Sequence, residues 1–220
     1  MKKDAKIVGV WGGRGSGKST RIKELTKTNN RLIVLDPIGD YAQGGGFSEF
    51  RTLKGLFRHI KANWSKGFRC VLVVPRGSDA QGVLEILSDA LFKIQEPYYH
   101  GKDTRKLTLV VEEMALCYPE RTLGKAERNF MELINLGRHS GVEIIGASQR
   151  IAEVKKNFVG NCAEHYFFRM GSAVDYTASK QMIGAEHIGT HKKLQTHEFI
   201  HFCQGVVKAG KNKCNFRKRR

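Results

Sequence analysis

The sequence has no closely spaced pair of cysteines and no long apolar run. Its five cysteines are scattered and form no C-x-x-C pair, which favours reduced thiols in a cytosolic compartment over structural disulfides. No stretch approaches the roughly 18 apolar residues that a membrane span requires, and the N-terminus lacks the apolar core of a signal peptide. We therefore expect a soluble intracellular protein without an integral membrane segment.

Acidic residues are scarce. The 220 residues include 21 Asp and Glu against 38 Lys and Arg, so the formal net charge is +17. Such a charge attracts polyanions, and nucleic acid is the leading partner, with an anionic membrane surface second. A basic surface that only keeps the protein soluble is the alternative. The residues from Lys208 onward hold seven Lys or Arg and no acid, so we expect one domain over residues 1–207 and a basic tail over 208–220.

Closely spaced metal ligands are also missing. Four histidines, His187, His191, His197 and His201, precede Cys203, but zinc ligands usually come in tighter, paired spacings. We do not expect a zinc site in this segment.

A glycine-rich motif follows the first apolar run. The run Ile7, Val8 and Val10 leads into GGRGSGKST from Gly12, which fits the strand, G-x-x-x-x-G-K-[ST], helix order of a phosphate-binding P-loop. Glycines let backbone N–H groups turn toward phosphate oxygens, because no Cβ blocks the approach, and the helix that follows adds its N-terminal partial charge. The alternative is a glycine-rich turn that matches by chance.

The motif predicts a site for ATP or GTP. Lys18 would reach the β and γ phosphates, and the Ser19 hydroxyl would bind Mg²⁺. The residues expected to contact the nucleotide are Gly12, Gly13, Arg14, Gly15, Ser16, Gly17, Lys18, Ser19 and Thr20.

Apolar strands alternate with amphipathic helices along the rest of the chain, which is typical of an α/β protein with a mainly parallel sheet. We expect strands over residues 31–35, 69–74, 107–111, 142–147 and 164–169, followed by a hairpin of 196–202 and 205–209. We expect helices over residues 18–28, 53–64, 83–94, 126–137 and 172–182. Segments 44–46 and 117–125 read as loops within the domain.

Acidic residues follow two of these strands. Asp36 and Asp40 come after the second strand, and Glu112 and Glu113 directly follow the run LTLVV. A nucleotide site with Mg²⁺ needs one carboxylate near the metal and, for hydrolysis, a second to orient or deprotonate water. Two acids in a solvated loop are the alternative.

The strand over residues 142–147 ends in Ser148, Gln149 and Arg150. A polar residue at the tip of a strand beside the P-loop can touch the γ-phosphate and the attacking water, so Gln149 is the candidate sensor. A surface glutamine in a loop is the alternative.

Together these motifs resemble those of the HerA and FtsK type DNA-pumping ATPases. Within that family, the closest pattern is that of the small genome-packaging ATPases of tailless membrane-containing phages and related large DNA viruses. The residues that carry the resemblance are GGRGSGKST from Gly12, LDPIGDY from Leu35, LVVEEM from Leu109 and LGRHSGVEIIGASQRIAEV from Leu136.

The resemblance implies a role for each matching residue. Lys18 and Ser19 would bind nucleotide and Mg²⁺, Glu112 would support the metal, and Glu113 would be the catalytic base. Gln149 would be the sensor, and Arg138 the arginine finger. Glu112 departs from the family pattern, which usually has Asp at that position.

The resemblance also implies a fold and a function. The fold is a single P-loop NTPase domain of the ASCE, RecA/FtsK-like kind, with the Gln149 strand between the P-loop strand and the Glu113 strand. The function is an ATP-hydrolysing motor that moves double-stranded DNA, as a homo-oligomeric and usually hexameric ring, into a capsid. Capsid vertex proteins would be further partners, and the protein would lie in the host cytoplasm or with the virion.

Three other interpretations stay open. A filamentous-phage-type assembly ATPase is similar in sequence pattern, although such proteins usually carry a membrane anchor. A P-loop small-molecule kinase would need an acceptor pocket, and the net charge would have no explanation. A nucleotide-gated binding protein without turnover would have no use for Glu113. Arg76 and the 117–125 loop are the candidates for contacting DNA in a pore.

Overall fold

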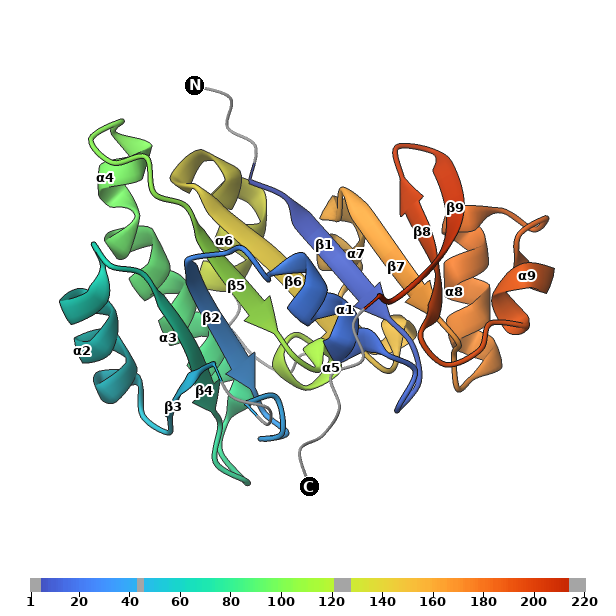
Figure 1. The fold of residues 1–220 in the computed structure, drawn as a ribbon, viewed down its shortest axis with the longest axis horizontal. Coiled ribbons are helices and arrows are strands. Elements are labelled where there is room, and N and C mark those ends of the chain that lie inside the picture. Colours follow the sequence, from blue (N-terminus) through green and yellow to red (C-terminus); the bar gives the residue numbers. More distant parts are fainter. Residues whose placement is uncertain (1–4, 43–45, 121–127, 214–220) are drawn as a thin grey trace.

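The computed structural model describes residues 5–42, 46–120 and 128–213, and a single nine-stranded sheet runs through it (Figure 1). The strands are β1 (Ile7–Trp11), β2 (Arg31–Asp36), β3 (Ser48–Phe50), β4 (Phe68–Val73), β5 (Leu107–Val111), β6 (Val142–Ser148), β7 (Glu164–Phe168), β8 (Glu198–Cys203) and β9 (Val206–Lys211). The central strands are rich in Val, Ile and Leu and buried along most of their length, as expected of strands covered on both faces.

The strand order is β3-β4-β2-β5-β6-β1-β7-β8-β9. Strands β1 to β7 pair in parallel, and β8 and β9 pair antiparallel at one end. The expected α/β fold with a C-terminal hairpin is confirmed, and β6 lies between β1 and β5, as the resemblance implied. This order brings the carboxyl ends of β1, β5 and β6 to one edge of the sheet, where open α/β sheets bind their ligands.

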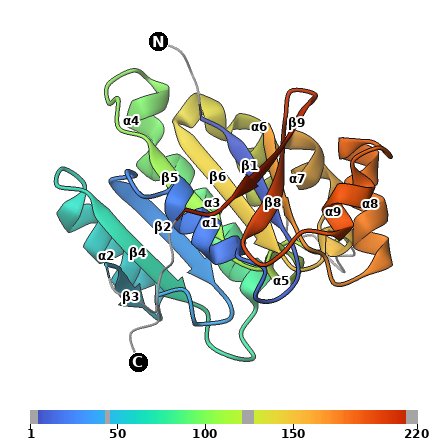
Figure 2. The same ribbon diagram turned by 45° about the vertical axis from the view of Figure 1, so that its right-hand side comes forward.

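The helices are distributed unequally over the two faces (Figures 1 and 2). The longer ones are α1 (Lys18–Leu25), α2 (Leu53–Asn63), α3 (Ala80–Ile94), α6 (Arg128–Leu136) and α8 (Ala173–Ile183). Short ones are α4 (Glu96–Tyr99), α5 (Met114–Cys117), α7 (Lys156–Asn161), α9 (Ile188–Lys192), and the 3-10 turns η1 (Gly137–Ser140) and η2 (Ile151–Glu153). Helix α1 packs on one face through Ile22, while α2, α3, α6, α7 and α8 bury their apolar residues on the other.

Several boundaries differ from the sequence expectation. Helix α1 ends at Leu25, and the C-cap residue Thr26 bonds to the Ile22 carbonyl through both its N–H at 2.9 Å and its hydroxyl at 2.8 Å. Helix α3 begins three residues earlier than expected, where the Asp79 side chain caps the Gly82 N–H at 3.0 Å. Strand β3 was not expected, since three residues carry too little periodicity to read.

The C-terminal strand also reaches further than expected. Residues 208–211, assigned to the basic tail by their charge, pair with β8, so Lys208 lies opposite His201 and Lys211 opposite Glu198. The rest of the predicted tail from residue 214, and most of the 117–125 loop, lie outside the described residues. Within the described part of the chain, no helix is long and apolar enough to cross a membrane.

Candidate active site

The P-loop leaves β1 through three glycines that a larger residue could not replace. Gly12, Gly15 and Gly17 have φ values of 154°, 71° and 114°, in the region that favours glycine. A Cβ on Gly12 would lie 2.6 Å from the Phe168 Cβ. The glycines therefore allow a backbone path that most other residues would adopt only with strain, and the Gly12 and Gly13 N–H groups bond to the carbonyls of Ser148 at 3.2 Å and Arg169 at 2.8 Å.

The side chain of Lys18 bonds back to the start of the P-loop. Its Nζ donates to the carbonyls of Gly12 at 2.7 Å and Gly13 at 3.2 Å, and the residue is 9% exposed. Burial lowers the pKa of Lys18, while the charges of Glu112, Glu113 and Asp40 oppose that shift. The Ser16 hydroxyl oxygen nearby is buried without a hydrogen-bond partner among the described residues. A buried ammonium and an unpartnered hydroxyl in one loop fit an anionic ligand.

Glu113 is held by the tip of the neighbouring strand. It has a left-handed backbone, with φ of 59°, which turns its carboxylate toward β6. That carboxylate accepts from the Ser148 hydroxyl at 2.6 Å, the Gln149 amide nitrogen Nε2 at 3.0 Å and the Gln149 backbone N–H at 3.2 Å. The structure thus brings together the predicted base and the predicted sensor, and a water molecule between them and the P-loop could be oriented by both.

Glu112 lies on the P-loop side of the same turn. Desolvation raises its pKa to about 7, opposed by a hydrogen bond from Ser19 and the charge of Lys18. A carboxylate beside a hydroxyl supplies the oxygen ligands that Mg²⁺ prefers. The Ser19 hydroxyl and the Glu112 carboxylate fit the expected metal, although no group of three or more His, Cys, Asp or Glu that could hold a metal ion gathers in the described residues, at this site or at another.

Asp36 has a structural role in this site. It is fully buried, and its carboxylate accepts from the backbone N–H groups of Ile38, Gly39 and Tyr41 at 2.8 to 2.9 Å. Its position at the carboxyl end of β2 suggested a ligand-facing carboxylate, but its oxygens accept the N–H groups of the turn that follows the strand.

Arg138 lies away from the sheet edge that carries the P-loop, Glu113 and Gln149. It lies exposed in η1, before β6 begins, while Gln149 lies after β6 ends. Its Nε donates to His139 Nε2 at 3.3 Å. The seven residues of β6 separate Arg138 from Gln149, which corresponds to about 20 Å along the strand at roughly 3.3 Å per residue.

Residues at the two ends of the β8–β9 hairpin bond to the P-loop on the side of β1 away from β5 and β6. The sequence analysis did not predict these contacts. The His197 N–H donates to the Ser16 carbonyl at 2.8 Å, and the Asn212 side-chain amide donates to the Gly17 carbonyl at 2.8 Å. The Lys213 N–H donates to Glu24 of α1 at 2.6 Å. The contact between Asn212 and Gly17 joins residues 195 positions apart in the chain, and no local sequence pattern around Asn212 predicts it.

The four C-terminal histidines have separate surroundings, and His187 has its Nε2 3.9 Å from the Glu186 carboxylate. His191 is buried, with Nε2 2.8 Å from the Phe168 carbonyl oxygen. His201 contacts Glu164 at 3.1 Å. His197 lies beside the P-loop, with its Nδ1 3.3 Å from the Asn212 amide nitrogen.

The fold and this arrangement define a P-loop NTPase site, in which the Glu113 strand and the Gln149 strand flank the P-loop strand on one side. The resemblance expected from the motifs is confirmed at the level of the fold by comparison with known proteins. No protein-family model matches the chain.

Two solved viral proteins share the fold over nearly the whole chain. The DNA-packaging ATPase B204 from Sulfolobus turreted icosahedral virus is 19% identical with a TM-score of 0.71, covering 94% of this chain and 97% of that one. The genome packaging NTPase B204 from Sulfolobus turreted icosahedral virus 2, in complex with AMPPCP, is 17% identical with a TM-score of 0.68, covering 96% and 99%.

Two further proteins are similar. EssC, ATPases 2 and 3, from Geobacillus thermodenitrificans is 8% identical with a TM-score of 0.60, and the match covers 97% of this chain and 41% of that one. In sequence, Protein P9 of Pseudoalteromonas phage PM2 is 26% identical over 165 residues, 74% of this chain and 68% of that protein.

Proposed function

We propose that the protein is an ATP-hydrolysing motor that translocates double-stranded DNA into a viral capsid. The observation that carries the proposal is the Glu113 carboxylate, held by Ser148 and Gln149 at the sheet edge that also bears the P-loop. A protein that only bound nucleotide would need no positioned base. The similarity to viral packaging NTPases supports the packaging role.

The chemistry follows from the positions of the side chains. Lys18 would leave the Gly12 and Gly13 carbonyls and neutralise the terminal phosphates, while the P-loop N–H groups bind their oxygens. Glu113 would accept a proton from the attacking water, and Gln149 would orient that water. Ser19 and Glu112 would hold Mg²⁺, which shields phosphate charge when bound.

A basic helix surface supports a polyanionic partner. Lys54, Arg58 and Lys61 of α2 are exposed and spaced i, i+4, i+7, so they lie on one side of the helix. Among the described helices of eight or more residues, α2 alone carries basic residues and no acid. We call these three residues the α2 basic stripe. Contacts to the phosphate backbone would let a motor bind duplex DNA with little sequence preference.

The ring is part of the proposal. Arg138 lies at the opposite edge from its own P-loop, so a catalytic role for it requires a second subunit, as in a homo-oligomeric, hexameric ring. Capsid vertex proteins would be the docking partners, in the host cytoplasm or on the virion.

Phosphate release with and without duplex DNA tests the proposal. We expect steady release of phosphate from ATP that duplex DNA stimulates, and complete loss of release in Lys18→Ala. Transfer of phosphate to a small acceptor would favour the kinase, and binding without turnover would favour the nucleotide-gated protein. Release that is insensitive to DNA would favour an assembly ATPase of the filamentous-phage type.

A further inference from the structure

A buried ion pair lies next to the residues that hold Glu113. The Asp175 carboxylate of α8 is fully buried; its Oδ2 accepts from the Arg150 Nε at 3.0 Å and its Oδ1 from the Ala152 N–H at 3.2 Å. The Arg150 side chain is 43% exposed and also pairs with Glu153 at 3.0 Å. A buried carboxylate is costly unless it is paired and hydrogen-bonded, so the pair fixes the position of Arg150 relative to α8.

The backbone of Arg150 extends this contact to the candidate base. The Arg150 N–H donates to the Ser148 hydroxyl oxygen at 3.2 Å, and the Ser148 hydroxyl donates to Glu113 at 2.6 Å. A hydroxyl has one hydrogen and two acceptor lone pairs, so it can accept from Arg150 while it donates to the carboxylate. Gln149, which lies between these two residues in the chain, donates to the same carboxylate. A chain of hydrogen bonds therefore runs from Asp175 to Glu113.

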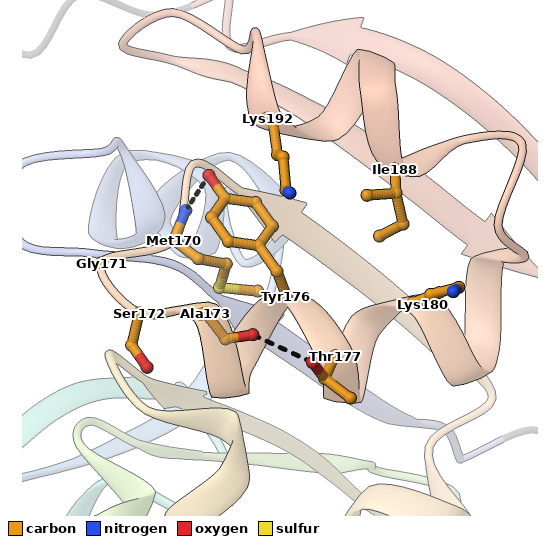
Figure 3. Close-up of a pocket in the computed structure, with 9 residues that line it drawn as sticks. All are labelled: Met170, Gly171, Ser172, Ala173, Tyr176, Thr177, Lys180, Ile188 and Lys192. Atoms are coloured by element: carbon orange, nitrogen blue, oxygen red, sulfur yellow. Dashed lines mark hydrogen bonds between the residues drawn. The ribbon is translucent and has the colours of Figure 1, made fainter.

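The first turn of α8, which carries Asp175, is itself fixed (Figure 3). The Ser172 hydroxyl accepts the Val174 N–H at 3.2 Å and caps the helix. The Tyr176 hydroxyl accepts the Met170 N–H at 3.2 Å, which ties the helix to the segment after β7. Asp175 lies between these two contacts, so its carboxylate is a rigid support for the arginine that it binds.

The ion pair joins the two sides of the P-loop strand. Arg150 follows β6 and Asp175 follows β7, and these two strands flank β1 on opposite sides. The segment between β7 and α8 also contacts the P-loop, since the Gly13 N–H donates to the Arg169 carbonyl at 2.8 Å. Helix α8 is therefore connected to the start of the P-loop and, through the ion pair, to the residues that hold the candidate base.

From these contacts we propose that Asp175 is a positioning residue for hydrolysis, which acts through Arg150 to orient the Glu113 carboxylate. The inference rests on the proposed function, because it assigns a support to the base of the same site. A general base acts at hydrogen-bond distance from the water that it deprotonates, so a small displacement of the carboxylate lowers the rate. The same displacement removes no group that binds ATP.

Asp175→Asn in the full chain tests this role, because it removes the charge that binds Arg150 and keeps an oxygen that can accept the Ala152 N–H. We expect kcat for phosphate release from ATP to fall about tenfold, as for one lost hydrogen bond to a charged group, and ATP binding to stay within about twofold. Asp103→Asn is the matched control and should change neither. The Asp103 carboxylate also pairs with an arginine, Arg105 at 2.6 Å, but it precedes β5, whereas the candidate base follows that strand.

A double variant separates positioning from a general structural fault. If Asp175 acts through the base, Asp175→Asn should lower the residual single-turnover rate of Glu113→Gln by less than about twofold, because the carboxylate that it orients is already gone. A structural fault would lower the rate about tenfold in both backgrounds, and that result would overturn the proposal.

A second variant guards against misfolding. Arg150→Gln/Asp175→Asn leaves neither partner of the pair charged, so no buried charge is left unpaired, and it should show the same fall in kcat as Asp175→Asn. Normal kcat in both variants would overturn the role of Asp175 and leave the proposed function intact. A wild-type protein that releases no phosphate from ATP would refute the proposed function, and this role with it.

Discussion

The two flanks of the P-loop differ in how they are built. On the flank of β5 and β6, the acidic flank, Glu113 is the second residue after β5 and Gln149 the first after β6, and their side chains meet at 3.0 Å. On the flank of β7 to β9, the hairpin flank, His197 before β8 and Asn212 after β9 bond to P-loop carbonyls from positions far along the chain. Candidate catalytic residues that follow strand ends can be predicted from a sequence, and residues that tertiary packing brings to the P-loop cannot.

The first prediction tests the acidic flank and has the largest expected effect. Glu113→Gln keeps the size of the side chain and removes the base, so hydrolysis should fall about a thousandfold, within the range for general-base catalysis. ATP binding should stay within about twofold, because the P-loop is untouched. Single-turnover phosphate release and direct ATP titration measure the two effects. Glu186→Gln, an exposed glutamate distant from the P-loop in sequence, is the control, and normal turnover in Glu113→Gln would refute the assignment of the base.

The second prediction concerns the sheet edge opposite to both flanks. Arg138 is exposed in η1, and Arg138→Ala should reduce hydrolysis in assembled rings about a hundredfold, less than the full effect known for arginine fingers. Mixed rings of Arg138→Ala and Lys18→Ala subunits should regain part of the activity, because some interfaces then join an intact P-loop to an intact finger. Arg128→Ala, which removes another exposed arginine, should change neither. Normal hydrolysis by Arg138→Ala alone would refute the role of Arg138 in catalysis. The residue would then only complement the helix dipole at the end of its helix.

The third prediction tests the hairpin flank. Asn212→Ala removes the donor to the Gly17 carbonyl. ATP and inorganic tripolyphosphate, which has the phosphates and no nucleoside, should both bind about fivefold more weakly, as expected for one lost hydrogen bond. Asn212→Asp should be worse than Asn212→Ala, since it places an anion against that carbonyl and near the phosphates.

Its control is Asn161→Ala, which removes an amide that bonds to a carbonyl of its own helix at 2.8 Å. If Asn212→Ala weakens only ATP, or neither compound, the hairpin does not position the P-loop.

The same contrast explains how much the sequence predicts. The P-loop, Glu113 and Gln149 lie in short motifs with a fixed relation to a strand, and the β-branched strands predict the parallel sheet. The role of Asp36 could not be predicted from the sequence, because a carboxylate at the end of a strand can face a ligand or cap a turn. The three backbone N–H groups that donate to it in the structure show that it caps a turn. Asn212 belongs to a segment whose charge predicted a tail, yet the pairing of β9 with β8 fixes its position.

The last prediction has the smallest expected effect and concerns DNA rather than nucleotide. The charge of an exposed lysine or arginine contributes to duplex binding only if it releases a counterion, and each phosphate so neutralised adds about 0.9 to the slope of log affinity against log salt. Arg58 lies in the middle of the α2 basic stripe, so Arg58→Gln should reduce that slope by about one unit and leave ATP binding unchanged. Lys93→Gln is the matched control, because Lys93 is 74% exposed but paired with Asp89 one turn away. A salt titration of duplex binding measures the slopes; if Arg58→Gln and Lys93→Gln have the same slope as the wild type, α2 faces solvent and DNA contacts another surface.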